Sequence, residues 1–324
     1  MVVAVLMNWN GIEVSYRKKP ILSLCLSSLA RTRYKNLKVV MVDPGSADNS
    51  IDYVLKNFKK VDVLREKDVS LDYETNQAIE YALKKYPGMR YVLWLNNDII
   101  FNNRDWLQKM IDVAESDEGV GVVGCRLLYP DGKIQHAGMR AGIMPLNLGR
   151  GDADKSVYRR ITEVESTTGA VMLIKREVIE KIGLLDEHLY GGFEDVDYCL
   201  RAKSAGFKVM YAGDAAAIHL EGFTDSRSGV SKSNSRFYRE QFCYVYYAFR
   251  HFGALKRITI ILIELGRSVV SVEGKGRKRG LSGIRIKDAP LWRIYASFKA
   301  IFKGYGLYRH YLTHKSVKYR PAVF

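Results

Sequence analysis

The segment Tyr91-Val92-Leu93-Trp94-Leu95-Asn96-Asn97-Asp98 carries the clearest structural pattern of this chain. Its first five residues form a continuous apolar run, as expected of a strand that is buried on both faces. The run ends abruptly in two amides and an acid. Ligands of open α/β sheets bind at the carboxyl ends of the strands, so we expect Asp98 to lie at a ligand site.

The ninety residues before this segment alternate short apolar runs with amphipathic stretches. Such alternation is typical of a parallel sheet whose strands are connected by helices. Asn8 follows the first apolar run and Asp43 ends the second, so polar groups should gather along one edge of the sheet. We predict strands at 2–6, 37–42, 61–64 and 91–95, and helices at 20–30, 50–59 and 71–85.

A second acidic cluster lies in Gly191-Gly192-Phe193-Glu194-Asp195-Val196-Asp197, ahead of a helix-like run. Like charges this close repel one another, and burial strengthens the repulsion. Such a cluster normally faces a metal, another cation or a proton that is to be moved. Around it the pattern is looser. We expect strands at 120–124, 170–174 and 207–211, a helix at 176–182 and an irregular glycine-rich region at 129–154.

The net charge of +16 is unevenly distributed along the 324 residues. Residues 1–230 hold 31 Lys and Arg against 31 Asp and Glu, whereas residues 231–324 hold 20 against 4. We therefore predict a neutral domain over 1–230 and a basic extension over 231–324, with a boundary near 226–231. The length allows one large domain or two ordinary ones.

The cysteines and the amino-terminal residues indicate the cellular compartment in which we expect the protein. Four cysteines, Cys25, Cys125, Cys199 and Cys243, are widely separated and form no metal-ligand or disulfide pattern. We expect reduced, buried thiols. The apolar start at 1–7 is short and lacks a basic segment, so no signal peptide is evident. We expect a cytoplasmic protein.

The basic extension interleaves aromatic and cationic residues. Phe and Tyr recur through 236–252, a short apolar segment at 258–263 is followed by Glu264, a basic loop lies at 275–279, and 292–304 again mixes the two types. A membrane-spanning helix needs about 20 mostly apolar residues, so 258–263 is too short. Amphipathic cationic helices suit an anionic membrane surface. The aromatics could instead pack as ordinary core, and single-stranded nucleic acid is a further alternative, although no known binding motif is present.

In chain order, the motifs resemble those of inverting family 2 glycosyltransferases, especially the rhamnosyltransferase-like branch. The likeness covers about residues 1–225. The matching stretches are Asn8-Trp9-Asn10, Val42 through Asp48, Leu95-Asn96-Asn97-Asp98, Gly132 through Gly138, Thr168-Gly169-Ala170, Gly183 through Gly206, and His219. Two departures concern the donor: Pro44 follows Asp43 where a polar residue is usual, and 67–70 replace a loop that usually contains glycine. They leave the donor base and sugar open.

The resemblance implies a nucleotide-sugar-binding fold of the GT-A type, a divalent Mg²⁺ or Mn²⁺, and transfer with inversion at the sugar carbon. By matching positions, Asp195 is the expected general base. Asp98 is expected to hold the metal, with His219 as a further ligand. The expected donor-binding residues are Asn8, Asp43, Asn76, Asn97, Gly169 and Glu194.

The same residues also have purely structural interpretations. Asn and Asp at 96–98 favour a turn, and acids at 194–197 suit the first turn of a helix. A single histidine such as His219 is more often structural than a ligand. We regard His136 as structural and expect Trp9 in the core.

The sequence therefore predicts a metal-dependent inverting glycosyltransferase of mixed α/β fold. Its partners would be a nucleotide-sugar donor, a glycan or lipid-linked acceptor and, through the extension, the cytoplasmic face of an anionic membrane. Two alternatives remain: a nucleic-acid-binding protein that uses the basic extension, and a metal-dependent phosphohydrolase. The second lacks a nucleophilic aspartate at position 96, which is Asn.

Overall fold

The computed structural model describes residues 1–324 except 68–69, 190–191, 222–233, 275–283, 289–290 and 315–324. The expected boundary near 226–231 and the basic loop at 275–279 lie outside the described residues. The chain divides into two compact units, Met1–Gly229 and Val230–Phe324.

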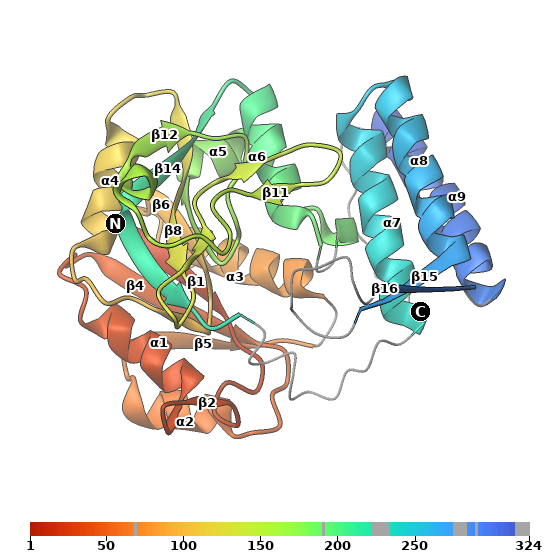
Figure 1. Cartoon of the computed structure of the whole chain (residues 1–324). Coiled ribbons are helices and arrows are strands. Elements are labelled where there is room, and N and C mark those ends of the chain that lie inside the picture. Colours follow the sequence, from red (N-terminus) through yellow and green to blue (C-terminus); the bar gives the residue numbers. More distant parts are fainter. Residues whose placement is uncertain (68–69, 190–191, 222–233, 275–283, 289–290, 315–324) are drawn as a thin grey trace. The chain divides into compact units, whose positions relative to one another are not determined.

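The first unit is built around a ten-stranded sheet (Figure 1). Its main path runs in the order β12 (Ile161–Glu163), β14 (Lys208–His219), β8 (Val120–Leu128), β13 (Val171–Lys175), β6 (Tyr91–Asn96), β1 (Val2–Met7), β4 (Leu37–Asp43) and β5 (Val61–Arg65). Off this path, β7 (Ile99–Ile100) pairs with β14, and β9 (Ile134–His136) pairs with β8.

Most strands of the main path run in one direction. β5, β4, β1 and β6 are parallel to one another, and β8 and β14 are parallel to each other. β13 lies antiparallel between β6 and β8, and β12 is antiparallel to β14. The predicted mixed α/β fold with a mostly parallel sheet is therefore confirmed.

Helices cover both faces of this sheet. Alternate residues of β1 point to opposite faces, because side chains alternate along a strand. Val2, Ala4 and Leu6 contribute to a core with α1 (Ile21–Ala30), α2 (Ser50–Asn57) and α4 (Trp106–Glu115). The residues between them contribute to a second core with α3 (Leu71–Lys85), α5 (Arg176–Ile182) and α6 (Glu194–Ser204). The result is a three-layer sandwich that leaves the strand ends accessible to loops.

The helix α3 begins and ends where the sequence predicts. Its start is well capped: the Ser70 hydroxyl accepts from Tyr73 N at 3.2 Å, and Ser70 N donates to the Glu74 carboxylate at 3.1 Å. This reciprocal pair satisfies amides that the helix itself leaves free. The helix α4 was not predicted, and β14 extends eight residues beyond the predicted strand end at 211. Trp9 is 39% exposed, so the expectation of a core position was wrong.

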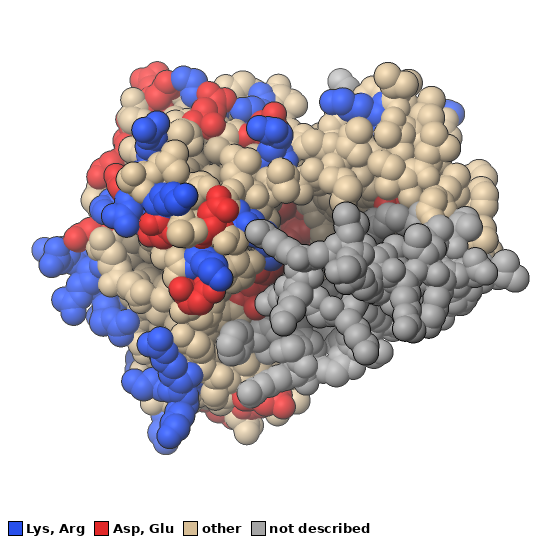
Figure 2. All heavy atoms as spheres, in the orientation of Figure 1, with Lys and Arg blue, Asp and Glu red and all other residues tan. Residues whose placement is uncertain are grey.

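Smaller elements lie outside the main sheet. They are β2 (Ser15–Tyr16), β3 (Lys19–Pro20), β10 (Met139–Arg140), β11 (Leu146–Asn147), η1 (Ser156–Arg159) and η2 (Glu187–Leu189). All four cysteines are free and buried, as expected. Figure 2 shows Lys and Arg intermixed with Asp and Glu over the first unit, in agreement with its balanced charge.

The second unit is mainly helical. Its elements are α7 (Asn234–His251), α8 (Ala254–Val269), α9 (Leu291–His314) and the antiparallel pair β15 (Val270–Gly274) and β16 (Ile284–Asp288). The helix α9 packs against α7 and α8. The aromatic residues from Phe242 to Phe252 in and after α7 are buried, as in an ordinary core. Among the described helices, none has the length and apolar character needed to cross a bilayer.

Candidate active site

The pair Asp98 and His219 lies where β7, the short strand after β6, pairs with the end of β14. After β6 the chain turns into β7, which pairs antiparallel with the end of β14, so His219 lies opposite Ile99. His219 Nε2 is 3.2 Å from Asp98 Oδ1, and both side chains are largely buried. Asp98 Oδ1 accepts no hydrogen bond. A buried oxygen beside an imidazole nitrogen suits a cation, because uncompensated burial of a carboxylate is costly.

This pair fits a divalent cation that is only partly enclosed by protein. Carboxylate oxygen and imidazole nitrogen are both ordinary metal ligands. Within the part of the chain that the structure describes, no group of three or more His, Cys, Asp or Glu side chains could hold a metal. An ion held by Asp98 and His219 would therefore keep most of its coordination positions for oxygen atoms of a bound molecule.

A buried polar chain connects the ends of β6, β1 and β4. Asn97 Nδ2 donates to Asn8 Oδ1 at 2.8 Å, and Asn8 Nδ2 donates to Asp43 Oδ2 at 2.7 Å. The other Asp43 oxygen accepts from the amides of Gly45 and Ser46 at 3.0 and 2.7 Å. Three predicted donor-site residues thus form one network. In it, Asp43 shapes the loop after β4.

The carboxylate of Asp195 is held at the start of α6. Its Oδ1 accepts from Val196 N at 2.7 Å and its Oδ2 accepts from Gly169 N at 3.1 Å. Burial raises the pKa of Asp195, while these amide hydrogen bonds and one from Thr168 lower it. Phe193, just before the helix, has a left-handed φ of 72°, which is uncommon for a residue with a side chain. The carboxylate is therefore positioned by backbone groups of two different elements.

The neighbouring Glu194 is in a less favourable environment for a charge. Its Oε2 is buried and has no hydrogen-bond partner. Burial, followed by the repulsion of Asp195, raises the pKa of Glu194 to about 8. At neutral pH we therefore expect Glu194 to carry a proton.

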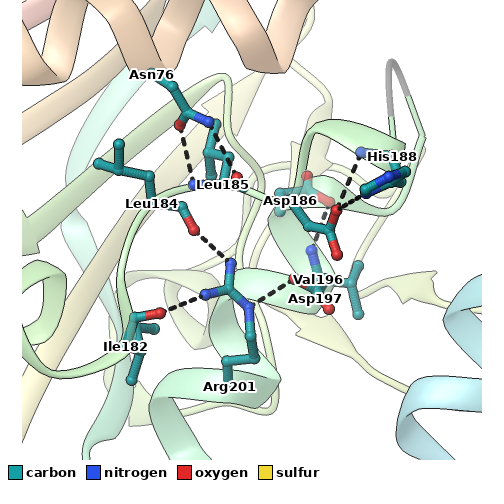
Figure 3. A network of polar contacts seen from close by, with 10 residues as sticks. Asn76, Ile182, Leu184, Leu185, Asp186, His188, Val196, Asp197 and Arg201 are labelled. Atoms are coloured by element: carbon teal, nitrogen blue, oxygen red, sulfur yellow. Dashed lines mark hydrogen bonds and ion pairs between the residues drawn. The ribbon is translucent and has the colours of Figure 1, made fainter. Parts of the chain in front are cut away.

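Asp197 has a structural role that separates it from the other two acids. Its side chain is fully buried and accepts from Arg201 Nε at 2.8 Å, one helical turn later. The same guanidinium donates to Ile182 O at 3.0 Å and to Leu184 O at 2.9 Å (Figure 3). Arg201 therefore joins α6 to the loop after α5. Asp197 is occupied in this network, which leaves Asp195 as the acid presented by the first turn.

Asn76 performs a similar connecting role from α3. Its amide exchanges two hydrogen bonds of 3.0 Å with the backbone of Leu185, and also donates to Glu187 at 2.9 Å (Figure 3). This predicted donor-site residue is buried and holds the loop that leads to the acidic cluster. Asp72 precedes Asn76 by four residues in α3, which is about one helical turn. Asp72 therefore lies on the same side of the helix as Asn76 and faces the acidic cluster.

The two acidic sites converge on the same edge of the sheet. Asn96 N donates to Ala170 O at 3.1 Å, where the end of β6 meets the start of β13. Asp98 lies two residues after Asn96, and Gly169, which binds Asp195, lies one residue before Ala170. The predicted metal ligand and the predicted base are therefore brought together by an antiparallel pairing between segments about 75 residues apart.

Two site residues were missed. Asp72 is completely buried, and within the described part of the chain neither of its carboxylate oxygens has a hydrogen-bond partner. In the sequence, an acid in the first turn of a helix indicates only a favourable interaction with the helix N-terminus. Gln135 contacts His219 with its side chain. It lies in a motif that was recognised, but no role was attached to it.

His136, next to Gln135, is structural as predicted. It is buried between Asn147 Oδ1 at 2.6 Å and Thr167 Oγ1 at 3.1 Å. Burial lowers the pKa of His136 to about 4, so the ring is neutral at physiological pH. Adjacent residues of β9 point to opposite sides, which directs Gln135 toward His219 instead.

A comparison with protein families identifies the relationship. The family described as glycosyltransferase like family 2 matches residues 14–241. The chain belongs to this family. Its predicted relationship to family 2 glycosyltransferases is confirmed.

Curated relatives come from several bacteria. The chain is 30% identical over 227 residues to the uncharacterized protein y4gI of Sinorhizobium fredii, covering 66% of the chain and 24% of the relative. It is 29% identical to the O-antigen biosynthesis protein RfbC of Myxococcus xanthus, of which it spans 17%. The chain therefore spans about a quarter or less of these relatives. It is 24% identical to an N-acetylglucosaminyl-diphospho-decaprenol L-rhamnosyltransferase of Mycobacterium tuberculosis, covering 75% of the chain and 84% of the relative.

Solved structures show the fold. TarS of S. aureus in complex with UDP-GlcNAc matches with a TM-score of 0.55 at 14% identity, over 98% of this chain and 93% of that one. The mannosyltransferase PcManGT of Pyrobaculum calidifontis, in complex with GDP-Man and Mn²⁺, matches with a TM-score of 0.52 at 15% identity, over 98% and 76%. These likenesses confirm the predicted GT-A fold.

Proposed function

We propose that this chain is a metal-dependent inverting glycosyltransferase. It would move a sugar from a nucleotide-diphosphate donor to a hydroxyl group of a glycan or a lipid-linked glycan. The observation that carries this proposal is the convergence of the Asp98–His219 pair and Asp195 on one edge of the sheet. Family membership supports it, as do the rhamnosyltransferase and O-antigen names of the relatives.

Asp98 and His219 would hold Mg²⁺ or Mn²⁺. When bound there, the ion would supply positive charge to the diphosphate that leaves the sugar. Asn8, Asp43 and Asn97 would form the wall against which the nucleotide lies, with their mutual hydrogen bonds keeping that wall rigid. The likeness to structures that contain Mn²⁺ agrees with this assignment.

Asp195 would act as the general base. Inversion by direct displacement requires a base that takes the proton of the acceptor hydroxyl on the face opposite the leaving group. Burial raises the pKa of Asp195, which strengthens it as a base, and its two amide contacts keep it oriented. Glu194 and Gly169 would support it, Glu194 as a neutral neighbour and Gly169 through its amide.

The two alternative functions find less support. The match to the family 2 glycosyltransferases covers residues 14–241 and so includes both acidic sites. A phosphohydrolase or a nucleic-acid-binding protein would not be expected to give this match. The aromatic residues of α7 from Phe242 to Phe249, which could have stacked on bases, are buried.

The second unit presents an apolar surface on two helices. Leu255, Ile258 and Leu262 of α8 are 80%, 55% and 63% exposed, at the spacing of one helical face. On α9 an aromatic stripe is similarly exposed, comprising Tyr295, Phe298, Phe302 and Tyr305. We call these seven residues the apolar face. Exposed apolar groups within a segment of 20 Lys and Arg against 4 Asp and Glu fit an anionic bilayer. We propose that this unit binds the cytoplasmic face of the cell membrane, where a lipid-linked acceptor would be found.

The proposed reaction is tested with three variants. The thermal unfolding midpoint of purified protein would be measured with UDP, GDP or dTDP, with and without Mn²⁺. In a separate assay, the protein would be screened for sugar transfer or donor hydrolysis. One nucleotide should stabilise the wild type only together with Mn²⁺. Asp98→Ala should lose that joint stabilisation. Asp195→Asn should keep it but lose about 10²–10⁴-fold in turnover, the usual contribution of a general base.

A matched control is Asp112→Asn on the exposed side of α4, which should behave as the wild type. Full activity of Asp195→Asn would remove this residue as the base. The absence of a joint effect of any nucleotide and Mn²⁺ on the wild type would contradict the proposed function as a whole.

A further inference from the structure

A series of side-chain contacts connects Asp98 to the protein surface. His219 Nδ1 lies 2.6 Å from Gln135 Oε1, and Gln135 Nε2 donates to Glu221 Oε2 at 3.1 Å. Arg150 donates to both oxygens of Glu221, at 2.9 and 2.8 Å. Gln135 is 3% exposed, so it has little access to water, whereas Arg150 and Glu221 form a half-exposed ion pair.

Glu221, at the surface end of this series, determines which group donates and which accepts in each of its hydrogen bonds. Both oxygens of Glu221 accept hydrogen bonds from the Arg150 guanidinium, and a carboxylate paired in this way only accepts hydrogen bonds. The amide nitrogen of Gln135 must therefore point to Glu221, and the amide oxygen to His219. An amide oxygen also only accepts, so Nδ1 of His219 carries the hydrogen.

The consequence concerns the contact between His219 and Asp98. In a neutral imidazole with its hydrogen on Nδ1, the other nitrogen carries a lone pair. That lone pair faces Asp98 Oδ1 across 3.2 Å. Two acceptors at this separation repel each other unless a positive charge lies between them. The side chains beyond His219 thus prepare the pair for a cation.

We propose that Gln135 is a positioning residue that keeps the hydrogen of His219 on Nδ1, and that Glu221 and Arg150 fix the orientation of Gln135. This inference rests on the proposed function only where it calls the bound cation a metal. Partners in this position typically change metal affinity by 10–100-fold.

The topology supports the same conclusion. Gln135 lies in β9, which pairs with β8, and His219 ends β14, which also pairs with β8. Glu221 follows His219 by two residues, and Arg150 comes from the loop after β11. Residues of three separate segments therefore take part in this series of contacts.

The first measurement is the hydrogen position on His219. Long-range ¹H–¹⁵N NMR at pH 8, without metal, should show the hydrogen on Nδ1 in the wild type. The signal is assigned by its loss in His219→Asn. In Gln135→Leu, which keeps the size but removes the acceptor, the hydrogen should move largely to Nε2 and donate to Asp98.

The second measurement is Mn²⁺ affinity in the presence of the preferred nucleotide diphosphate, followed by titration calorimetry. Gln135→Leu should weaken binding by about 10–100-fold. The double variant Gln135→Glu with Glu221→Gln exchanges the amide and the carboxylate but keeps an acceptor on Nδ1. It should restore both the hydrogen position and most of the affinity.

Unchanged hydrogen position and unchanged affinity in Gln135→Leu would overturn the proposal. If that variant does not fold, Glu221→Gln tests the same point, because an amide at 221 no longer forces the orientation of Gln135 and a mixture of both ring forms is expected. A failure of the proposed transferase activity would leave the NMR result unaffected, so the two failures can be told apart.

Discussion

Asp72 shows how a single residue can lower stability at neutral pH. Burial, followed by the charges of Glu194, Asp186 and Asp195, raises the pKa of Asp72 well above the ordinary carboxyl value. The folded protein therefore keeps a proton that the unfolded chain releases above about pH 4. The free energy of unfolding consequently falls as the pH rises from that point through the raised pKa. Glu194 acts in the same direction up to about pH 8.

This linkage predicts that Asp72→Asn stabilises the protein. The amide has the shape of the protonated acid but no proton to lose. Thermal unfolding at pH 8 should show a midpoint a few degrees above that of the wild type, and the difference should shrink toward zero near pH 4. A lower midpoint than the wild type at pH 8 would show that an ionised Asp72 is stabilised by a partner.

At the scale of secondary structure, the entry to β13 and the start of α6 depend on each other through Gly169. Its amide donates to Asp195, and its Cα lies against the Trp94 indole of β6. An added Cβ would lie 2.6–2.8 Å from three ring atoms of Trp94. No side chain fits this space, so glycine is required here by packing.

We therefore predict that Gly169→Ala damages both stability and activity. Overpacking of this kind typically costs about 1–3 kcal/mol, which denaturant unfolding would measure. The displaced amide should also misorient Asp195, so turnover should fall more than nucleotide binding. Gly306→Ala in α9, where an added Cβ meets no atom within 4 Å, is the matched control. It should leave activity intact and should not lower stability, because alanine favours a helix more than glycine does. Equal stability of the two variants would refute the packing argument.

For the whole molecule, the apolar face and the basic charge of the second unit predict reversible membrane binding. The pair Phe298→Ser and Phe302→Ser should weaken binding to liposomes of anionic lipid at least tenfold, because burying each ring contributes about 1.5–3 kcal/mol. The control pair Val157→Ser and Ile161→Ser removes residues of the first unit that are 52% and 53% exposed, and should have no effect. Co-sedimentation measures both.

Salt provides a second criterion. Binding should weaken between 50 and 300 mM salt, because screening reduces the attraction of basic residues to anionic lipid. Unchanged co-sedimentation of the aromatic double variant would refute the assigned role of the apolar face. Tighter binding to a single-stranded oligonucleotide than to liposomes would favour the nucleic-acid alternative instead.

The sequence by itself determined the four long strands and three helices of the first hundred residues, but not the two-residue strands β2, β3 and β7. Their apolar runs and helical periodicities are local patterns, and local patterns are readable within a short window. The same holds for the bounds of α3 and for the basic composition of the extension. The family motifs added the identity of Asp98, Asp195 and His219, although not the way they are held.

Only the tertiary structure decided which polar groups meet. The pairing of β7 with β14 joins His219 to Asp98, which lies 121 positions earlier in the chain, and nothing local to either residue encodes that register. Tertiary packing likewise joined Arg201 to the carbonyls of Ile182 and Leu184, buried Asp72 with no hydrogen-bond partner among the described residues, and exposed Trp9. Burial and partner choice depend on contacts between distant segments, and these form only when the whole sheet is assembled.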